Sequence, residues 1–497
     1  MTAVKVVLPA EGPRRWHRLA VDRLAAAGHD VVVATSRTGG RRNRLLETLL
    51  AAERRIRGTT QTSLTAPIPA FDAGGAAGRP CRLVLDLSEG AGAGSRDAPV
   101  LAARFQGQPD FTAAAAVLCR GDVPVVDLYL DGEHVAHAAP MSYGRSFVSR
   151  GLDDVVARAI TLLVDFVNRY EAAPAGRARA AAPAATATPA TSSALARAYL
   201  SSALPRLARK ALRNLRYHGA HWRVGYRLHD GPGVAETLSL GGLAWSVLPD
   251  DGDRFYADPF PVDWEGRQLI FVEELVHARG KGVIAVSERG PDGVFGTPRQ
   301  VLEEPWHLSY PQVFAHDGEM WMIPESGAGR QLVLYRAREF PDRWVRHRVL
   351  LAGREVFDAT LLRHEGLFWL LGTERDGAGN ASDTMAVFFA ERLEGPWRPH
   401  PENPVLIDRS AARPGGAFAR LGERIVLPVQ DGSAGYGGGL GLSELVRLDP
   451  EHVELSPPVP IDPAGDWPYP LIHTLNRHGR LECIDGMAQV PRRGVRR

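Results

Sequence analysis

The chain has 497 residues, too many for one hydrophobic core, so its length predicts two or three domains. Hydrophobic residues make up 44% and charged residues 23%, as in ordinary globular proteins. The net charge is only +2, so the overall charge gives no reason to expect nucleic-acid binding. The three cysteines are odd in number and far apart, which excludes a disulfide framework and a cysteine-based zinc site and suits a reducing compartment.

Residues 1–171 alternate short apolar runs with helical patterns. The first run, residues 4–8, is too short for a secretory signal or a membrane span, so we expect a cytoplasmic protein. Strands separated by helices predict a parallel, Rossmann-like α/β sheet. We expect strands at 4–8, 31–34, 83–87 and 100–105, helices at 16–27, 43–57, 112–119 and 152–170, and a hairpin of residues 125–130 and 134–137.

Residues 172–193 are almost wholly Ala, Pro, Thr, Ser and Arg, which predicts a flexible linker. Residues 194–221 contain an amphipathic helix with leucines on one face and only basic charges on the other. The basic residues are Arg206, Arg209, Lys210, Arg213 and Arg216. Two interpretations stay open: the helix rests peripherally on an anionic membrane surface, or it docks on the following domain with a solvated basic face.

One pattern recurs in residues 222–490: an apolar strand, a turn with glycine, a second strand, then an acid or amide. The turn glycines, about 50 residues apart, are Gly266, Gly318, Gly366, Gly422 and Gly479. Five copies of this period predict a five-bladed β-propeller, with a β-sandwich as the alternative. The fold class is therefore mixed: an α/β domain, then a propeller, then a basic tail at residues 491–497.

The string Ala257-Asp258-Pro259 resembles the first blade of five-bladed glycoside hydrolases of the arabinanase, xylosidase and invertase type. Residues 222–490 resemble more closely the propeller domain at the N-terminus of plant glucosamine inositolphosphorylceramide transferases. The strings that carry this resemblance are Phe255-Tyr256-Ala257-Asp258-Pro259-Phe260, His307-Leu308-Ser309-Tyr310-Pro311 and Pro324-Glu325-Ser326. Residues 1–171 resemble, more weakly, a formyltransferase-like Rossmann domain. That family's catalytic Asn, His and Asp have no recognisable match in this sequence.

Glycosidic chemistry needs one group that protonates or accepts the leaving oxygen and one carboxylate that activates a nucleophile or stabilises positive charge. Residues at the inner strands of different blades converge on a propeller's axis, so we expect Asp258, Glu325 and Asp358 to be catalytic. Asp258 precedes Pro259, which favours an extended conformation pointing into the central funnel. The expected substrate-binding residues are Glu274, His307, Tyr310, Glu374, Arg413, Gln430, Asp431, Tyr436 and His473.

Three functions remain open: glycosyl transfer in surface polysaccharide or glycolipid synthesis, glycoside hydrolysis, and a non-catalytic glycan-binding scaffold. The cytoplasmic expectation, the basic helix and the transferase resemblance favour transfer. Tyr310-Pro311 occupies the second-blade position where the hydrolases carry an acid, which opposes hydrolysis. We expect a sugar or glycan as substrate, no nucleic-acid partner and no cofactor or metal, with a divalent cation in the propeller channel as the alternative.

Overall fold

The computed structural model describes residues 3–9, 12–36, 42–69, 80–89, 98–172, 190–465, 467–469 and 471–492. The chain divides into two compact units, the first formed by residues 1–212 and 376–380 and the second by residues 213–375 and 381–497. Most of the predicted linker and of the basic tail lies outside the described residues. The predicted domain boundaries therefore stay predictions.

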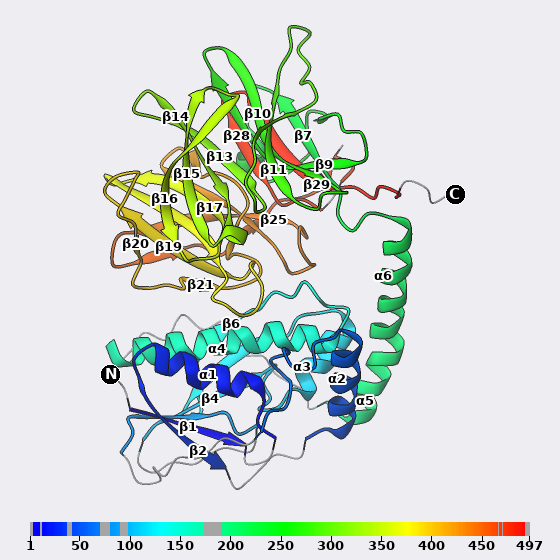
Figure 1. The fold of residues 1–497 in the computed structure, drawn as a ribbon, viewed down its shortest axis with the longest axis vertical. Coiled ribbons are helices and arrows are strands. Elements are labelled where there is room, and N and C mark those ends of the chain that lie inside the picture. The colour runs from blue at the N-terminus through cyan, green and yellow to red at the C-terminus, as the bar shows by residue number, and fades with distance from the viewer. Residues whose placement is uncertain are drawn as a thin grey trace. The chain divides into compact units, whose positions relative to one another are not determined.

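The first unit contains a six-stranded sheet with the order β2-β1-β3-β4-β5-β6 (Figure 1). Its strands are β1 (Ala3–Pro9), β2 (Asp30–Ser36), β3 (Leu83–Asp86), β4 (Val100–Phe105), β5 (Val126–Leu130) and β6 (Glu133–Ala138). The first four are parallel, as the alternation of strands and helices predicts, whereas β5 and β6 pair antiparallel. The sheet is thus mixed, because the hairpin adds two antiparallel strands at its edge. The finer Rossmann-like assignment stays a prediction.

Apart from the last one, none of whose side chains is buried, the helices of the first unit pack on this sheet and on one another. They are α1 (Arg15–Ala26), α2 (Arg44–Ile56), α3 (Thr112–Arg120), α4 (Val148–Ala172), α5 (Ser192–Ala198), the π-helical turn Tyr199–Ala203 and α6 (Leu204–Arg216), which reaches into the second unit. Figure 1 shows α1 and α4 side by side, and the two helices are in contact. Val155, Val156 and Ile160 of α4 are fully buried and form part of the core.

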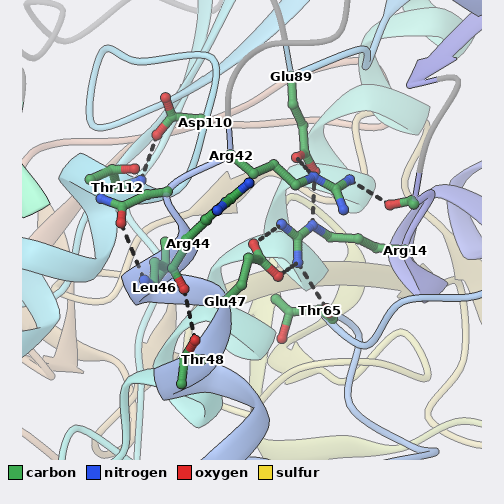
Figure 2. A network of polar contacts seen from close by, with 12 residues as sticks. Arg14, Arg42, Arg44, Leu46, Glu47, Thr48, Thr65, Glu89, Asp110 and Thr112 are labelled. Atoms are coloured by element: carbon green, nitrogen blue, oxygen red, sulfur yellow. Dashed lines mark hydrogen bonds and ion pairs between the residues drawn. The ribbon is translucent and has the colours of Figure 1, made fainter.

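A buried arginine forms ion pairs and a hydrogen bond with several segments of the first unit (Figure 2). The guanidinium of Arg14, just before α1, lies 2.6 Å from a Glu47 carboxylate oxygen on α2 and 3.0 Å from one of Glu89. It also donates to the carbonyl of Thr65 at 3.1 Å. Glu89 in addition pairs with Arg42 at 3.4 Å. Since Arg14 is 2% exposed, these ion pairs compensate for burying its charge.

The second unit is a propeller of five antiparallel sheets. Blade one comprises β9 (Arg254–Trp264), β10 (Arg267–Val276), β11 (Gly282–Glu288) and β12 (Arg299–Leu302); blade two comprises β13 (Ser309–His316), β14 (Glu319–Glu325), β15 (Gln331–Glu339) and β16 (Arg343–Ala352). Blade three comprises β17 (Val356–His364), β18 (Leu367–Glu374), β19 (Thr384–Ala390), β20 (Arg398–Pro399) and β21 (Leu406–Ile407). Blade four comprises β22 (Arg413–Pro414), β23 (Ala419–Leu421), β24 (Arg424–Gln430), β25 (Leu440–Leu448), β26 (Val453–Leu455) and β27 (Val459–Pro460). The short helices α7 (Val234–Thr237) and Gly327–Gly329 lie in the connections.

The fifth blade joins the two ends of the propeller sequence. Its order is β28 (Leu475–His478), β29 (Leu481–Met487), β7 (Trp222–Leu228) and β8 (Ser246–Val247), so the inner strands come from the C-terminal end and the outer strands from the beginning. Hydrophobic clusters lie between blades one and two, two and three, three and four, four and five, and five and one. These clusters close a ring, which confirms the five-bladed propeller.

The turn glycines form the tight hairpins that the repeat predicts. Gly266, Gly318 and Gly366 have φ of 77°, 77° and 80°, and each follows a residue that also has positive φ. Two such residues between antiparallel strands make a type I′ turn, which matches the right-handed strand twist. A side chain at the second position is strained, and glycine is not.

Candidate functional site

The inner strands of blades one to three carry a β-bulge at equivalent positions. In each, two residues of the inner strand oppose one residue of its neighbour, and the first of the two is Asp258, Tyr310 or Asp358. Their φ values are 50°, 45° and 49°. The expectation that Asp258 is extended is therefore wrong. The bulge overrides the preference of a residue before proline, because the neighbouring strand fixes the inner strand on both sides.

The second strand of each hairpin places one polar side chain beside the bulge or the corresponding inner-strand position. Glu273 pairs with Ala257, Glu325 with Ser309, and Thr373 with Phe357. Gln430 pairs with Arg413 in blade four, and the backbone of Asp485 bonds that of Thr474 in blade five. Together with His307 and His473, which precede the inner strands β13 and β28, these positions and the bulges build a largely buried group of charged and amide side chains. This axial cluster consists of Asp258, Glu273, His307, Glu325, Asp358, Arg413, Gln430, His473 and Asp485.

Asp258 and His473 form the centre of the axial cluster in blades one and five. Nε2 of His473 lies 3.6 Å from Oδ1 of Asp258, and its Nδ1 lies 2.5 Å from Oδ2 of Asp485. Oδ1 of Asp258 accepts a hydrogen bond from the Thr474 hydroxyl at 2.8 Å, and Oδ2 accepts one from the backbone N–H of Tyr310 at 3.1 Å. One carboxyl group thus links three blades.

The imidazole of His473 is held by aromatic rings as well as by acids. It stacks on Trp222 with ring centroids 3.9 Å apart and an interplanar angle of 3°, and it meets Tyr436 edge-on at 5.4 Å. A cationic imidazole on an aromatic face gains electrostatic attraction, so this stack favours the protonated ring.

Asp358 forms the ion pair of blades three and four. Its Oδ2 lies 2.6 Å from Nε of Arg413 and accepts a hydrogen bond from the amide of Gln430 at 2.8 Å. Arg413 also donates to the carbonyl of Ala381 and the hydroxyl of Ser382. These bonds fix the guanidinium, whose Cζ lies over the ring of Tyr436, 5.3 Å from the ring centroid.

Glu325 and His307 belong to the side of the cluster nearest blade two. Glu325 accepts hydrogen bonds from the Ser309 hydroxyl at 2.8 Å and the backbone of Gly327 at 2.6 Å. Nε2 of His307 lies 3.3 Å from Glu273, and its side chain is 33% exposed. Because the acids around it are buried, His307 is where this side of the cluster reaches solvent.

Burial and crowding of like charges shift the titration of the cluster. Burial raises the pKa of Asp258 to about 7; His473 opposes this rise, and the charges of Asp358 and Glu273 add to it. Burial likewise raises the pKa of Glu325. For His473 and His307 burial works in the opposite direction, but neighbouring carboxylates outweigh it and raise both pKa values to about 9. A carboxyl group that exchanges protons near neutral pH thus lies beside a histidine cation.

Several expected binding residues lie outside the axial cluster. Glu274 pairs with Arg254 at 2.5 Å, and Glu374 pairs with Arg354 at 2.7 Å. Asp431 accepts the backbone N–H of Ser433 in its own loop. Successive side chains of a strand point to opposite faces, so the residue just before each of these three faces the axis instead.

Tyr310 is at the centre but is fully buried. Its hydroxyl contacts that of Thr360 at 2.8 Å and accepts a hydrogen bond from the backbone of Gly416 at 2.7 Å. Burial strongly raises the pKa of this phenol. Tyr310 therefore joins blades two, three and four, and its contribution to a ligand site is to hold the inner strands in place.

Sequence reasoning missed Asp485, Glu273, Thr474 and Trp222 as site residues. Glu273 could have been found by counting, because it stands seven residues after its turn glycine, as Glu325 does. Asp485 ends the fifth copy of the repeat but follows a different spacing. The stack of Trp222 on His473 depends on the closure of the ring, which has no local signal in the sequence.

The side chains of Asp258, His473 and Asp485 bring three potential metal-ligand atoms within 4.8 Å of one another. Their oxygens, however, already accept hydrogen bonds: Oδ1 of Asp485 takes the backbone N–H groups of His473 and Thr474, and Oδ2 takes that of Asp258. A buried carboxylate with these donors is compensated without a cation. The geometry therefore favours a protonated histidine over a divalent ion in the channel.

The fold and the axial cluster define a five-bladed propeller with a buried, acid-rich centre. Residues 249–461 match the family model described as glucosamine inositolphosphorylceramide transferase 1, N-terminal, which confirms the resemblance seen in the sequence. The Arabidopsis thaliana protein of that name is 32% identical over 224 residues, covering 44% of this chain and 29% of its own length. The Oryza sativa subsp. japonica protein is 31% identical over 258 residues, covering 48% and 34%. The chain thus spans about a third of the length of these relatives.

Among solved structures, the propeller is similar to glycoside hydrolases. A family 117 glycoside hydrolase of Zobellia galactanivorans has 12% identity and a TM-score of 0.34 and covers 49% of this chain and 78% of its own. An exo-beta-1,3-galactanase of Clostridium thermocellum has 13% identity and a TM-score of 0.35, covering 48% and 60%. Similarity at this level does not extend to activity.

Proposed function

We propose that the propeller binds a glycosyl group at the axial cluster and takes part in its transfer to a glycolipid or surface-polysaccharide acceptor. The observation that carries this proposal is the convergence of buried acids, two histidines and Arg413 from five blades on one centre. The match of residues 249–461 to a domain of transferases that act in glycolipid synthesis supports transfer over other sugar chemistry.

In this proposal Asp258 is the group that exchanges a proton with a sugar hydroxyl. Its pKa of about 7 lets it accept or donate a proton near neutral pH, and the cation of His473 stabilises the carboxylate after the proton leaves. Glu325 and Asp358 add negative potential that would stabilise positive charge at an anomeric carbon. Arg413, at the edge of the cluster near Tyr436, is suited to a hydroxyl, carboxylate or phosphate group.

A glycan-binding scaffold without catalysis is the second candidate. It is supported by the satisfied state of the carboxylates, since Asp258, Glu325 and Asp358 all accept hydrogen bonds from the protein itself. The matched region also covers only part of each relative. Hydrolysis has less support, because Tyr310 replaces the second-blade acid and its hydroxyl is engaged within the protein.

Adjacent residues on β10 provide a matched test of the site. Asp258→Asn on β9 and Glu273→Gln on β10 change the axial cluster, whereas Glu274→Gln changes the opposite face of β10. We expect transfer of glucosamine to inositolphosphorylceramide vesicles to fall by at least about 10²-fold in Asp258→Asn and to stay unchanged in Glu274→Gln. Equal activity in all variants would contradict the proposed site. Sugar binding without turnover in the wild type would favour the scaffold.

We further propose that α6 rests on an anionic membrane surface. Leu204, Leu212 and Leu215 are 47%, 50% and 70% exposed, and none of the α6 side chains is buried. Arg206 donates to carbonyls of the first unit, so the basic face available for lipid is formed by the other cations. Among the described helices, none combines the length and hydrophobicity needed to cross a membrane. The cytoplasmic location and the formyltransferase-like character of residues 1–171 stay predictions.

A further inference from the structure

The hairpin of β5 and β6 in the first unit gathers one acid and two histidines. Oδ1 of Asp127 lies 2.9 Å from Nε2 of His134 and 2.8 Å from Nδ1 of His137. Asp127 is fully buried, while the side chains of His134 and His137 are 16% and 19% exposed. The three residues thus form a group in which a buried carboxylate contacts two partly exposed imidazoles.

A β-bulge brings both histidines to the same face of the hairpin. In a regular strand, residues three apart point to opposite faces. Here Asp127 pairs with His137 and Tyr129 pairs with His134, and the register shift between these pairs leaves Val135 as the extra residue. Bulges redirect side chains in this way near functional sites. The convergence is therefore built into the strand pairing and does not depend on flexible side chains.

The carboxylate of Asp127 retains an unused ligand atom. Its Oδ2 is buried and has no hydrogen-bond partner among the residues that the structure describes. Leaving a buried carboxylate oxygen unpaired is costly, because it loses its hydration without compensation. An ion that both carboxylate oxygens of Asp127 bind, next to the two imidazoles, would remove that cost.

We propose that Asp127, His134 and His137 bind a divalent transition-metal ion of the Zn²⁺ type. The ligand atoms lie within 4.8 Å of one another, and two ligands at about 2.1 Å from a metal lie about 3.0–3.4 Å apart, close to the observed distances. Nitrogen donors favour Zn²⁺, Co²⁺ or Ni²⁺ over Ca²⁺ and Mg²⁺, which prefer oxygen ligands. Three protein ligands leave at least one coordination position open to water or a substrate at the exposed side.

Binding requires a change in which ring nitrogens carry hydrogen. In the metal-free hairpin, the two imidazoles can each donate an N–H to Asp127. With the ion bound, Nε2 of His134 and Nδ1 of His137 instead present lone pairs to the metal, and the hydrogens move to the opposite ring nitrogens. The metal takes the place of the two hydrogen bonds, and the ligand atoms need to move apart by only a few tenths of an ångström.

The test is isothermal titration of ZnCl₂ into the full-length protein after removal of metal with a chelator. The double variant His134→Gln/His137→Gln keeps amide donors for Asp127 but removes both imidazole ligands. We expect it to lose one zinc site of the wild type, with affinity at that site falling by at least about 100-fold, because even the loss of a residue that only orients a ligand costs about 10- to 100-fold. His364→Gln, which removes a histidine beside a single acid, should leave the titration unchanged.

A second measurement separates this site from others and does not require the variant to fold. Imidazole ¹⁵N resonances of the wild type should shift at His134 and His137 when Zn²⁺ is added. If zinc shifts only other histidines, or if only His473→Gln abolishes zinc binding, the proposal is overturned. The same holds if the wild type binds no zinc, or if the double variant binds it as the wild type does; the hairpin is then stabilised by its hydrogen bonds alone.

Discussion

The charge on His473 makes the stability of the propeller depend on pH. The side chain is 2% exposed, and burial alone would lower its pKa, but Asp485 and Asp258 raise the value to about 9. An unfolded histidine titrates near 6.5, so between about pH 6.5 and 9 the folded state binds more protons than the unfolded state. The resulting stabilisation is complete below pH 6.5 and is lost as the pH rises through 9. A pKa rise from 6.5 to about 9 corresponds to at most about 3 kcal/mol.

The variant His473→Gln tests this contribution, because glutamine can still donate to Asp485 but carries no charge. Calorimetry or urea unfolding of wild type and variant, at pH 6.5 and 9 and constant ionic strength, gives the difference in free energy of unfolding. We expect this difference to shrink by up to about 3 kcal/mol at the higher pH. A difference that is independent of pH, or larger at pH 9, would refute the assignment of a buried imidazolium.

Three further predictions concern the ion pairs and the basic helix. Asp358→Asn should lower the free energy of unfolding by about 3 kcal/mol, because it removes the buried carboxylate that lies 2.6 Å from the guanidinium of Arg413. A loss below about 1 kcal/mol by calorimetry would argue against this. Glu374→Gln should lower the free energy of urea unfolding by less than about 1 kcal/mol, because the side chains of Glu374 and Arg354 are 22% and 38% exposed. A loss above about 2 kcal/mol would be inconsistent with a peripheral role. Reversing Arg209, Lys210 and Arg213 of α6 to Glu should abolish salt-sensitive binding to anionic phospholipid vesicles in a flotation assay; unchanged binding would rule out the proposed surface.

The propeller can be predicted from sequence because each copy of its repeat contains recognisable turn and strand patterns. Each turn glycine is needed at a positive φ, as at Gly266, and the alternation around it marks the two strands of a hairpin. The closure of the ring carries no such signal. Strand β7 pairs with β29 although more than 250 residues separate them, and burial of the cluster between blades five and one helps to stabilise that pairing.

The site was predictable in its residue types and less so in its register. Asp258, Glu325 and Asp358 do lie in the axial cluster, and their catalytic role stays a proposal. The sequence analysis selected Glu274, whereas the neighbouring Glu273 lies in the cluster. Both residues are acids, and a shift of one residue along a strand places the side chain on the opposite face. The left-handed conformation of Asp258 could not be predicted either, since it follows from a bulge that forms only when the blades assemble.

A crystal structure of the protein with bound glucosamine tests the central claim most directly. We predict sugar density within hydrogen-bond distance of Asp258, Glu273 or Arg413, with His307 and Tyr436 at its solvent side. The same soak of the Asp258→Asn variant should show weaker or no density at this position. Sugar bound only elsewhere, for example in the hollow of about 520 Å³ lined by Arg420 and Arg477, would contradict the account.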